Sequence, residues 1–332
     1  MGSTSVLGRV IWVLCCVLLL GAAAGWGSTQ SVVASEVIWC LVDSDYNWEA
    51  PPFTDELLIL GFDGTIMTRL AQFGVDAGLG GKQPIAVLPD GQSAIVVESL
   101  VNRVGRFSPT GDELWSIERS ANSVSLGPAG LAYILTDSGL ISGESILSVN
   151  LADGSILKES QYGGMALAFD ETQGAVWVVG DDIKKLSLDL ELVWSSDPID
   201  WVALCVDTSP DGSAWIGVAG YESVDLLLHV APSGQLVQSI ELQSRPFSIS
   251  VDDGDDSVWV ATAVGLFKYD ALGNLVLSIG DKVTSVLVNQ ADHSVWYAQY
   301  TGVVGHCTAE GVTLDVFQTG RKGDYWISLA GD

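Results

Sequence analysis

Positive charge is scarce in this sequence, whose 332 residues contain 14 Lys and Arg against 41 Asp and Glu, a formal net charge of −27. The acidic residues are spread along the chain rather than gathered in a tail. A surface that binds nucleic-acid phosphates needs clustered Lys and Arg. The composition therefore argues against a nucleic-acid partner and favours solubility.

Histidine and cysteine are also scarce, with three His and five Cys. Cys15 and Cys16 lie in an apolar N-terminal run, whereas Cys40, Cys205 and Cys307 lie in apolar strand patterns without metal-ligand spacing. Three cysteines leave at least one thiol, and we interpret all three as small buried hydrophobic residues. A Cys40–Cys307 disulfide between the first and last repeats is the alternative.

The N-terminal residues have the order of a secretory signal peptide. Arg9 precedes the apolar run Val10–Leu20, and small residues follow it. We predict a signal peptide over residues 1–24, with cleavage near Ala24 and, as an alternative, near Ala34. The run is too short for a convincing membrane span, although an uncleaved anchor is a further alternative. The mature protein is then secreted or located in the periplasm or cell envelope, with no stable membrane span.

A repeated pair of elements fills residues 35–332, and no low-complexity stretch divides them into domains. The first element is an alternating apolar strand, a polar turn and a strand of the Val-Trp-Val type. The second is a hairpin around Gly, as in Gly265–Leu277. The marker residues of the first element are Ile95, Tyr133, Trp177, Trp215, Trp259 and Trp296. Their spacing of 37 to 44 residues is typical of propeller blades, and the period of two excludes helical repeats.

The first copy of the repeat is incomplete. Val37–Leu41 and the hairpin Leu57–Thr65 lack an inner strand, whereas Trp326–Leu329 at the other end of the chain resembles the inner strand Phe247–Val251. Pairing the two ends would leave no exposed edge in the first blade. We predict an all-β fold, a single β-propeller domain over 35–332 with seven four-stranded antiparallel blades closed by the C-terminal strand; six blades are the alternative.

These repeats resemble those of the NHL, YVTN and streptogramin-lyase-like bacterial propellers over nearly the whole mature chain. The resemblance implies the fold and not an activity, because these families mix enzymes with binding proteins. Streptogramin lyases need paired histidines around a metal. His229 and His306 share one repeat position with Arg106 and Lys268, which we interpret as an outward-facing polar position, and His293 falls in an acidic turn.

Charge is predicted to differ between the two faces of the ring. The turns between first and second strands hold Asp90, Asp170, Glu171, Asp207, Asp211, Asp252, Asp253, Asp255, Asp256 and Asp292. The connections between blades hold Lys82, Arg119, Lys158, Arg245, Lys282, Arg321 and Lys322. We expect one strongly acidic face and one face of mixed charge that recruits an anionic or polar ligand. The alternative is that these loops are polar only because loops in general are.

The longest insertions belong to the first blade and should emerge on the mixed face. One of them carries aromatic residues, which commonly bind ligands when they are exposed on long loops. Packing against the channel or a neighbouring blade is the alternative for Trp48 and Phe53. The candidate ligand-binding residues are Tyr46, Trp48, Phe53, Arg245, Lys282 and Arg321.

Four carboxylates at Asp252, Asp253, Asp255 and Asp256 suggest a metal site, because hard cations take several carboxylate ligands. Their spacing does not match the EF-hand loop, and Asp at such turns commonly accepts a backbone hydrogen bond instead. We predict no cofactor, with calcium or another divalent metal at these residues as the alternative.

No nucleophile and base form a recognisable pair, so we predict no catalytic residue. We expect a monomeric, exported and non-catalytic binding platform for a protein or glycan partner. The alternative is a metal-dependent hydrolase or lyase, lactonase-like or streptogramin-lyase-like, with carboxylates converging on the central channel.

Overall fold

The computed structural model describes residues 37–43, 55–75, 83–136, 145–199, 201–220 and 224–329. The chain divides into two compact units, Met1–Val33 and Ala34–Asp332, and the described residues all belong to the second. The predicted signal peptide lies outside them and stays a prediction. Among the described residues, no helix is long and apolar enough to cross a membrane.

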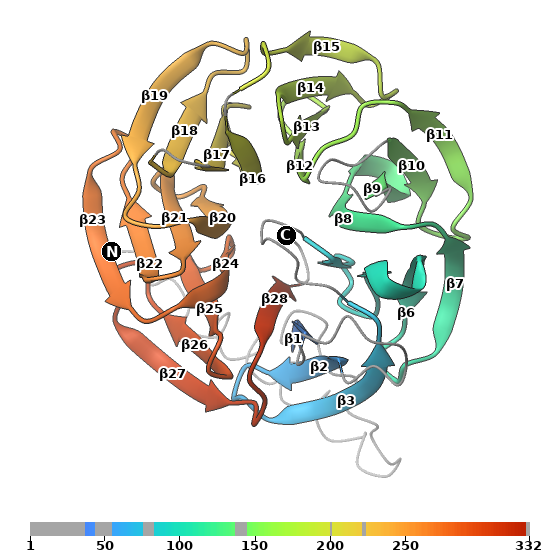
Figure 1. Cartoon of the computed structure of the whole chain (residues 1–332). Helices are drawn as coiled ribbons and strands as arrows, with labels where there is room; N and C mark the ends of the chain where they lie inside the picture. The colour runs from blue at the N-terminus through green and yellow to red at the C-terminus, as the bar shows by residue number, and fades with distance from the viewer. Residues whose placement is uncertain are drawn as a thin grey trace, which may run out of the picture. The chain divides into compact units, whose positions relative to one another are not determined.

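Within these ranges, seven four-stranded antiparallel sheets form the blades of a β-propeller (Figure 1). We name the strands of each blade A to D from the channel outward. Blade 1 contains β28 (Asp324–Leu329), β1 (Val37–Asp43), β2 (Asp55–Gly61) and β3 (Ile66–Phe73). Blade 2 contains β4 (Ile85–Val87), β5 (Ala94–Glu98), β6 (Arg103–Phe107) and β7 (Glu113–Glu118). Blade 3 contains β8 (Ala121–Leu126), β9 (Leu131–Thr136), β10 (Ile146–Asn150) and β11 (Ile156–Ser160).

The other four blades follow the same order without interruption. Blade 4 contains β12 (Ala166–Asp170), β13 (Ala175–Val179), β14 (Ile183–Ser187) and β15 (Leu192–Ser195). Blade 5 contains β16 (Val202–Thr208), β17 (Ala214–Ala219), β18 (Leu226–Val230) and β19 (Leu236–Glu241). Blade 6 contains β20 (Pro246–Asp252), β21 (Ser257–Thr262), β22 (Gly265–Tyr269) and β23 (Leu275–Gly280). Blade 7 contains β24 (Val283–Asn289), β25 (Ser294–Gln299), β26 (Val303–Cys307) and β27 (Thr313–Gln318). Short 3₁₀ turns follow β5 (η3, Ser99–Val101) and β8 (η4, Pro128–Gly130).

The C-terminal strand closes the ring, as the sequence predicted. β28 pairs antiparallel with β1, and Ser328 lies opposite Trp39. The seven-blade prediction is confirmed. The two ends of the described chain therefore share one sheet, so that unfolding of blade 1 separates them.

The blade markers identified in the sequence lie on the B strands, where neighbouring sheets cover both faces, and Trp39 holds the corresponding place on β1. The tryptophans at these positions are at most 1% exposed, namely Trp39, Trp177, Trp215, Trp259 and Trp296. Burial of such large side chains contributes to the hydrophobic stabilisation of these five blades.

The loops of the ring divide between two faces. The A–B and C–D turns lie on one face, which we call the A–B face. The B–C loops and the D–A connections between blades lie on the other, which we call the B–C face.

On the A–B face, each blade is fitted to the next through its C–D turn. Gly234, in the C–D turn of blade 5, has a φ of +87° and lies so close to Trp194 of blade 4 that a Cβ would stand 2.1 Å from the indole ring. Gly154 packs in the same way on Trp115, from blade 3 to blade 2. Glycine is required at these turns by both the backbone conformation and the close approach.

Hydrogen bonds between neighbouring A strands join the blades around the channel. Ser250 accepts the amide of Val288 at 3.1 Å, and Ser328 accepts that of Val87 at 3.0 Å. In blade 5 the equivalent position, opposite the B-strand tryptophan, is Asp207. This series of bonds holds the inner strands in register from blade to blade.

The repeat position shared by Arg106, His229, Lys268 and His306 is not outward-facing, and that prediction was wrong. Each residue lies opposite the B-strand marker in its blade, and Lys268 and His306 are 6% and 9% exposed. The rings of His229 and His306 stack on Trp215 and Trp296 with centroids 4.3 and 3.9 Å apart. Both faces of these sheets are buried, so alternation alone could not identify the side that faces solvent.

Lys185 of blade 4 occupies the same position, opposite Trp177, and its buried ammonium group pairs with an Asp and lies over the indole ring. Its Nζ lies 4.7 Å from the Trp177 ring centroid and 3.0 Å from Oδ2 of Asp170. It also donates to Gln173 in the adjoining turn. We call this arrangement the Lys185 brace, because it fixes the A–B turn against the outer strands of the blade.

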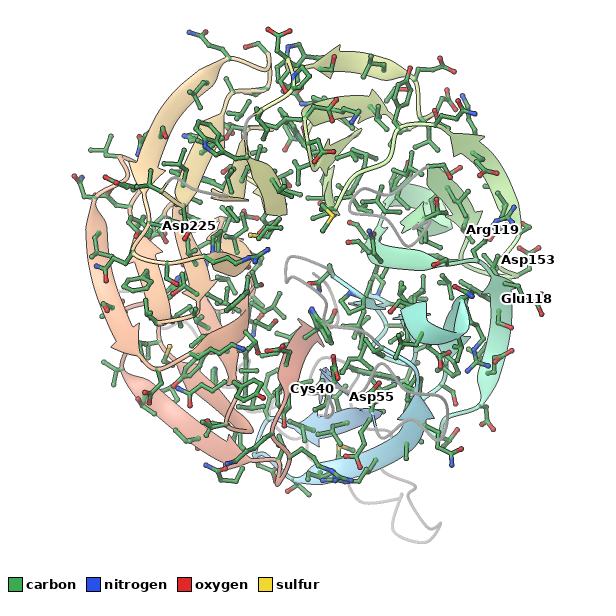
Figure 2. All side chains as sticks on the ribbon, viewed as in Figure 1. Cys40, Asp55, Glu118, Arg119, Asp153 and Asp225 are labelled. Carbon is green, nitrogen blue, oxygen red and sulfur yellow. The ribbon has the colours of Figure 1, made fainter. Side chains whose placement is uncertain are left out.

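Cys40, Cys205 and Cys307 are buried free thiols. Cys40 lies on β1 (Figure 2) and packs in the core between blades 7 and 1, whereas Cys307 packs with blades 6 and 7. The alternative of a Cys40–Cys307 disulfide was therefore wrong, and the interpretation as small buried hydrophobic residues is confirmed.

Candidate functional site

The described part of the A–B face is acidic. The A–B turns of blades 2 to 7 and the C–D turns of all seven blades contain fourteen Asp and Glu and no Lys or Arg. The acids of the A–B turns are Asp90, Glu171, Asp211, Asp253, Asp255, Asp256 and Asp292, and those of the C–D turns are Asp63, Asp112, Asp153, Asp189, Glu191, Asp270 and Glu310. The acidic face expected from the sequence is therefore present.

Many of these carboxylates serve the turns in which they lie. Backbone and side-chain hydrogen bonds from Thr65 and Ser155 lower the pKa values of Asp63 and Asp153. Asn274 acts in the same way on Asp270. A carboxylate that accepts such bonds is stabilised in its charged form. These acids therefore stabilise the turns by hydrogen bonding, and in their ionised form they make the face negative.

The predicted metal ligands have other partners. Asp252 accepts hydrogen bonds at one oxygen from the Gly254 amide at 2.9 Å and from His293 Nδ1 at 2.8 Å. Asp255 accepts the Ser257 amide and pairs with Lys268 at 3.0 Å. In the described part of the chain, no group of three or more His, Cys, Asp or Glu is arranged to hold a metal ion.

Two of the acids near the channel have raised pKa values. Burial of Asp207 between neighbouring A strands raises its pKa to about 6, although its carboxylate accepts the amides of Val251 and Thr208. Burial also raises the pKa of Asp253, and the nearby charges of Asp252 and Asp256 add to this effect. Sequence reasoning had counted Asp207 as a face residue, whereas its contacts make it part of the ring.

The B–C face differs, because it brings a cation and aromatic rings together at the meeting point of blades 6, 7 and 1. Lys282, in the D–A connection between β23 and β24, places its Nζ 4.2 Å from the ring centroid of Tyr300 and 5.3 Å from that of Phe247. The same Nζ lies 3.0 Å from Oδ1 of Asp324, the first residue of β28. We call these four residues the Lys282 cluster.

Backbone hydrogen bonds hold the Lys282 cluster in place. The Tyr300 amide donates to the Lys282 carbonyl, and the Gly323 amide donates to the Tyr300 carbonyl at 3.1 Å. The cluster remains accessible, since the side chains of Lys282 and Asp324 are 31% and 19% exposed. An ammonium group between two aromatic rings can bind an anionic group by charge, while the rings offer flat apolar surface for stacking.

Arg321, three residues before Asp324 in the chain, pairs with Glu56. The buried carboxylate of Glu56 contacts Arg321 at 2.6 Å and Arg69 at 2.5 Å, and Arg69 also donates to the Thr319 carbonyl. These contacts tie the connection before the closing strand to the outer strands of blade 1. Arg321 thus has a structural partner, and its side chain is also 44% exposed.

The remaining candidates are dispersed. Arg245 is partly buried and lies two residues before Phe247 in the connection to blade 6. Arg119 is at the periphery of the ring (Figure 2). Lys158 does not lie in a blade connection as expected, because it belongs to β11 and pairs with Glu191 at 2.7 Å. Tyr46, Trp48, Phe53 and Lys82 lie outside the described residues, so their roles stay predictions.

Two of the predicted residues therefore contact blade 1 through different partners, Lys282 through Asp324 at the start of β28 and Arg321 through Glu56 of β2. Phe247, Tyr300 and Asp324 surround Lys282, and they were not among the predicted site residues. They are distant in the chain and meet only because blades 6, 7 and 1 are neighbours. The sequence indicates only that each of these residues lies near the B–C end of its blade, at the start of an A strand or after a B strand.

No protein-family model and no curated protein matches this chain. Solved structures with similar folds include a streptogramin B lyase, with 13% identity and a TM-score of 0.59 over 74% of this chain and 85% of that one. BamB from Moraxella catarrhalis is 13% identical, with a TM-score of 0.53 over 85% of this chain and 91% of its own. Chaetomium thermophilum Sqt1, bound to the N-terminus of ribosomal protein L10, is 13% identical, with a TM-score of 0.62 over 86% and 88%. The resemblance expected from the sequence is confirmed for the fold.

Proposed function

We propose that the protein is an exported, non-catalytic platform that binds a protein or glycan partner through the B–C face. Its propeller fold is shared with the streptogramin-lyase, BamB and Sqt1 structures, and such a ring hosts both enzymes and binding proteins. The observation that carries the proposal is the Lys282 cluster. Sqt1, bound in its structure to a ribosomal-protein segment, is a precedent for protein binding by a ring of this shape.

The chemistry of the cluster indicates what the partner presents. Lys282 can donate three hydrogen bonds, of which Asp324 accepts one. An anionic or hydroxyl group of the partner can accept another, while an apolar or sugar ring packs on Tyr300. Aromatic residues combined with a cation are also common among the residues that dominate binding at protein interfaces.

The predicted aromatic residues Tyr46, Trp48 and Phe53 belong to the same proposal. In the sequence they fall between β1 and β2, outside the described residues, and we expect them on the face that carries the Lys282 cluster. Their contribution would add apolar area to the binding surface. No observation in the described residues favours the alternative of a metal-dependent hydrolase or lyase.

The test is capture of a partner from envelope extract and from a glycan array by the mature protein, compared with the double variant Lys282→Ala/Tyr300→Ala. We expect wild type to retain a partner that the double variant loses by about tenfold or more in affinity. The matched control is Asp211→Asn on the A–B face, which should bind as wild type does. Equal binding by all three proteins would overturn the proposal.

A further inference from the structure

The D strands form the outer circle of the ring (Figure 1), and each is the last strand of its sheet. An edge strand presents unpaired backbone N–H and C=O groups to which another strand can pair. Soluble proteins protect such edges with charged side chains or by keeping the strand short. The seven edges of this ring differ in whether they have that protection.

Five of the seven edge strands have charged side chains or are short. β15 has only four residues. The others have charged residues along the strand, namely Arg69 in β3, Glu113 and Glu118 in β7, Lys158 and Glu159 in β11, and Asp315 in β27.

The neighbouring edge strands β19 and β23 are neither short nor charged along their length. Both have six residues, β23 contains no charged residue, and the one charge in β19 is its last residue, Glu241. Both begin with a pair of exposed aliphatic residues. Leu236 and Val237 are 54% and 58% exposed, and Leu275 and Val276 are 47% and 60% exposed.

The C–D turn of blade 6 joins these pairs into one surface. Leu272 in this turn is 78% exposed. The adjacent Gly273 packs against Gln238 and Ile240 of β19, so that the turn lies on the outer strand of blade 5. We call the five exposed aliphatic residues, Leu236, Val237, Leu272, Leu275 and Val276, the aliphatic rim.

The negative charge around the aliphatic rim favours a partner that carries positive charge. Its two D strands and the turns before them, residues 231–241 and 270–280, contain two acids and no Lys or Arg. Hydrogen bonds from Asn274 lower the pKa of one of them, Asp270, which is therefore ionised at neutral pH. A second copy of this chain would bring a further net charge of −27 to the same surface, and like charges oppose such pairing.

We propose that β23 receives an extended segment of a partner protein as an additional strand, and that this segment carries both aliphatic side chains and Lys or Arg. Backbone hydrogen bonds to the edge of β23 supply affinity, as in other cases of strand addition. The aliphatic side chains of the segment pack on the aliphatic rim, and its cations pair with Asp270 and Glu241. The aliphatic rim lies at the beginning of β19 and β23, whereas Lys282 follows the end of β23, and this strand addition requires neither the Lys282 cluster nor the proposed function.

The experiment uses a short fluorescent peptide of alternating Val and Lys as the probe, measured by anisotropy with the full mature protein. Two control peptides accompany it, one with Glu in place of Lys and one with N-methylated backbone amides. The variants are Val276→Lys in β23 and Leu114→Lys in β7, which each add a cation at an exposed aliphatic position (60% and 51% exposed) on a D strand. We expect Val276→Lys to weaken binding about tenfold or more and Leu114→Lys to change it less than about twofold.

Both control peptides should bind at least about tenfold more weakly, because one reverses the charge and the other cannot complete the backbone ladder. Equal loss in the two variants, or no loss in either, would overturn the proposal. So would full binding of the N-methylated peptide, concentration-dependent dimers that Val276→Lys abolishes, or binding of the rim to neutral lipid vesicles in place of the peptide. The variant Lys282→Ala/Tyr300→Ala should bind the Val-Lys peptide normally, which separates this result from the test of the proposed function.

Discussion

The A–B face and the B–C face are made by the same seven blades but are built differently. The A–B face consists of short turns in which acids accept local hydrogen bonds and glycines fit against the preceding blade. On the B–C face the charges are mixed, and residues from three blades meet around an accessible cation. The difference indicates that side chains of the A–B face mainly stabilise turns and contacts between blades, whereas the B–C face leaves a cation partly exposed, which is the basis of the proposed function.

The largest difference in stability is expected when one lysine is replaced near each face, Lys185 beside an A–B turn and Lys282 on the B–C face. Lys185 and Lys282 each pair with an Asp and lie over an aromatic ring, but the Lys185–Asp170 side chains are 3% and 1% exposed. Lys185→Met leaves the Asp170 carboxylate buried without its cation and should cost about 3–5 kcal/mol of unfolding free energy. Lys282→Met should cost less than about 1 kcal/mol, because its pair is partly solvated.

Urea unfolding followed by tryptophan fluorescence measures both values. Similar losses for the two variants would show that Lys282 is as structural as Lys185 and would remove the distinction between the faces.

A pair of glycines gives a somewhat smaller test. Gly234 on the A–B face and Gly320 in the connection before β28 both have positive φ, but only Gly234 is packed closely by a neighbouring blade. Gly234→Ala adds a clash with Trp194 to the backbone strain and should cost about 3 kcal/mol. Gly320→Ala, with no heavy atom within 4 Å of the new Cβ, should cost only about 1 kcal/mol. Thermal melts of the two variants, run side by side, measure the difference. A larger loss of stability in Gly320→Ala than in Gly234→Ala would contradict the prediction.

Asp207 allows a test by pH. Its pKa rises from 3.8 to about 6 on folding, so between these values the folded state holds a proton that the unfolded state has released. Stability contributed by this group is therefore present below pH 4 and is lost as pH rises through 6, by up to about 3 kcal/mol. Serine occupies the equivalent position in blades 6 and 1 and accepts the same backbone bond.

We therefore expect Asp207→Ser to be more stable than wild type at pH 8, with a difference that shrinks as pH falls through 6 to 4. Urea unfolding of both proteins at these pH values is the measurement. A difference that does not depend on pH would show that Asp207 is not held in the unfavourable charged form by burial.

The ring itself was predictable because each blade repeats the same local pattern. The strand at Trp326–Leu329 had no partner of its own, and β1 lacked an inner neighbour, so closure followed from counting strands. The inward position of Lys268 and His306 was not predictable, since period-two alternation does not say which side of a sheet faces solvent when other sheets cover both. Lys158 was misplaced because the end of β11 has no marked sequence boundary.

The site was only partly predictable, for a different reason. Lys282 and Arg321 could be found because cations are rare in this chain and fall in connections between blades. Their partners Tyr300, Asp324 and Glu56 come from other blades, and Glu56 precedes Arg321 by 265 residues. Sequence periodicity predicts that the blades are neighbours but not which loop side chains meet.

Photo-crosslinking from one position on each face tests the central claim most directly. The two proteins carry a photoreactive phenylalanine analogue at Tyr300 on the B–C face or at Asp211 on the A–B face, and each is irradiated with the captured partner or glycan. The account predicts an adduct from position 300 and none from position 211. An adduct from position 211 alone would show that the acidic face binds the partner and would contradict the account.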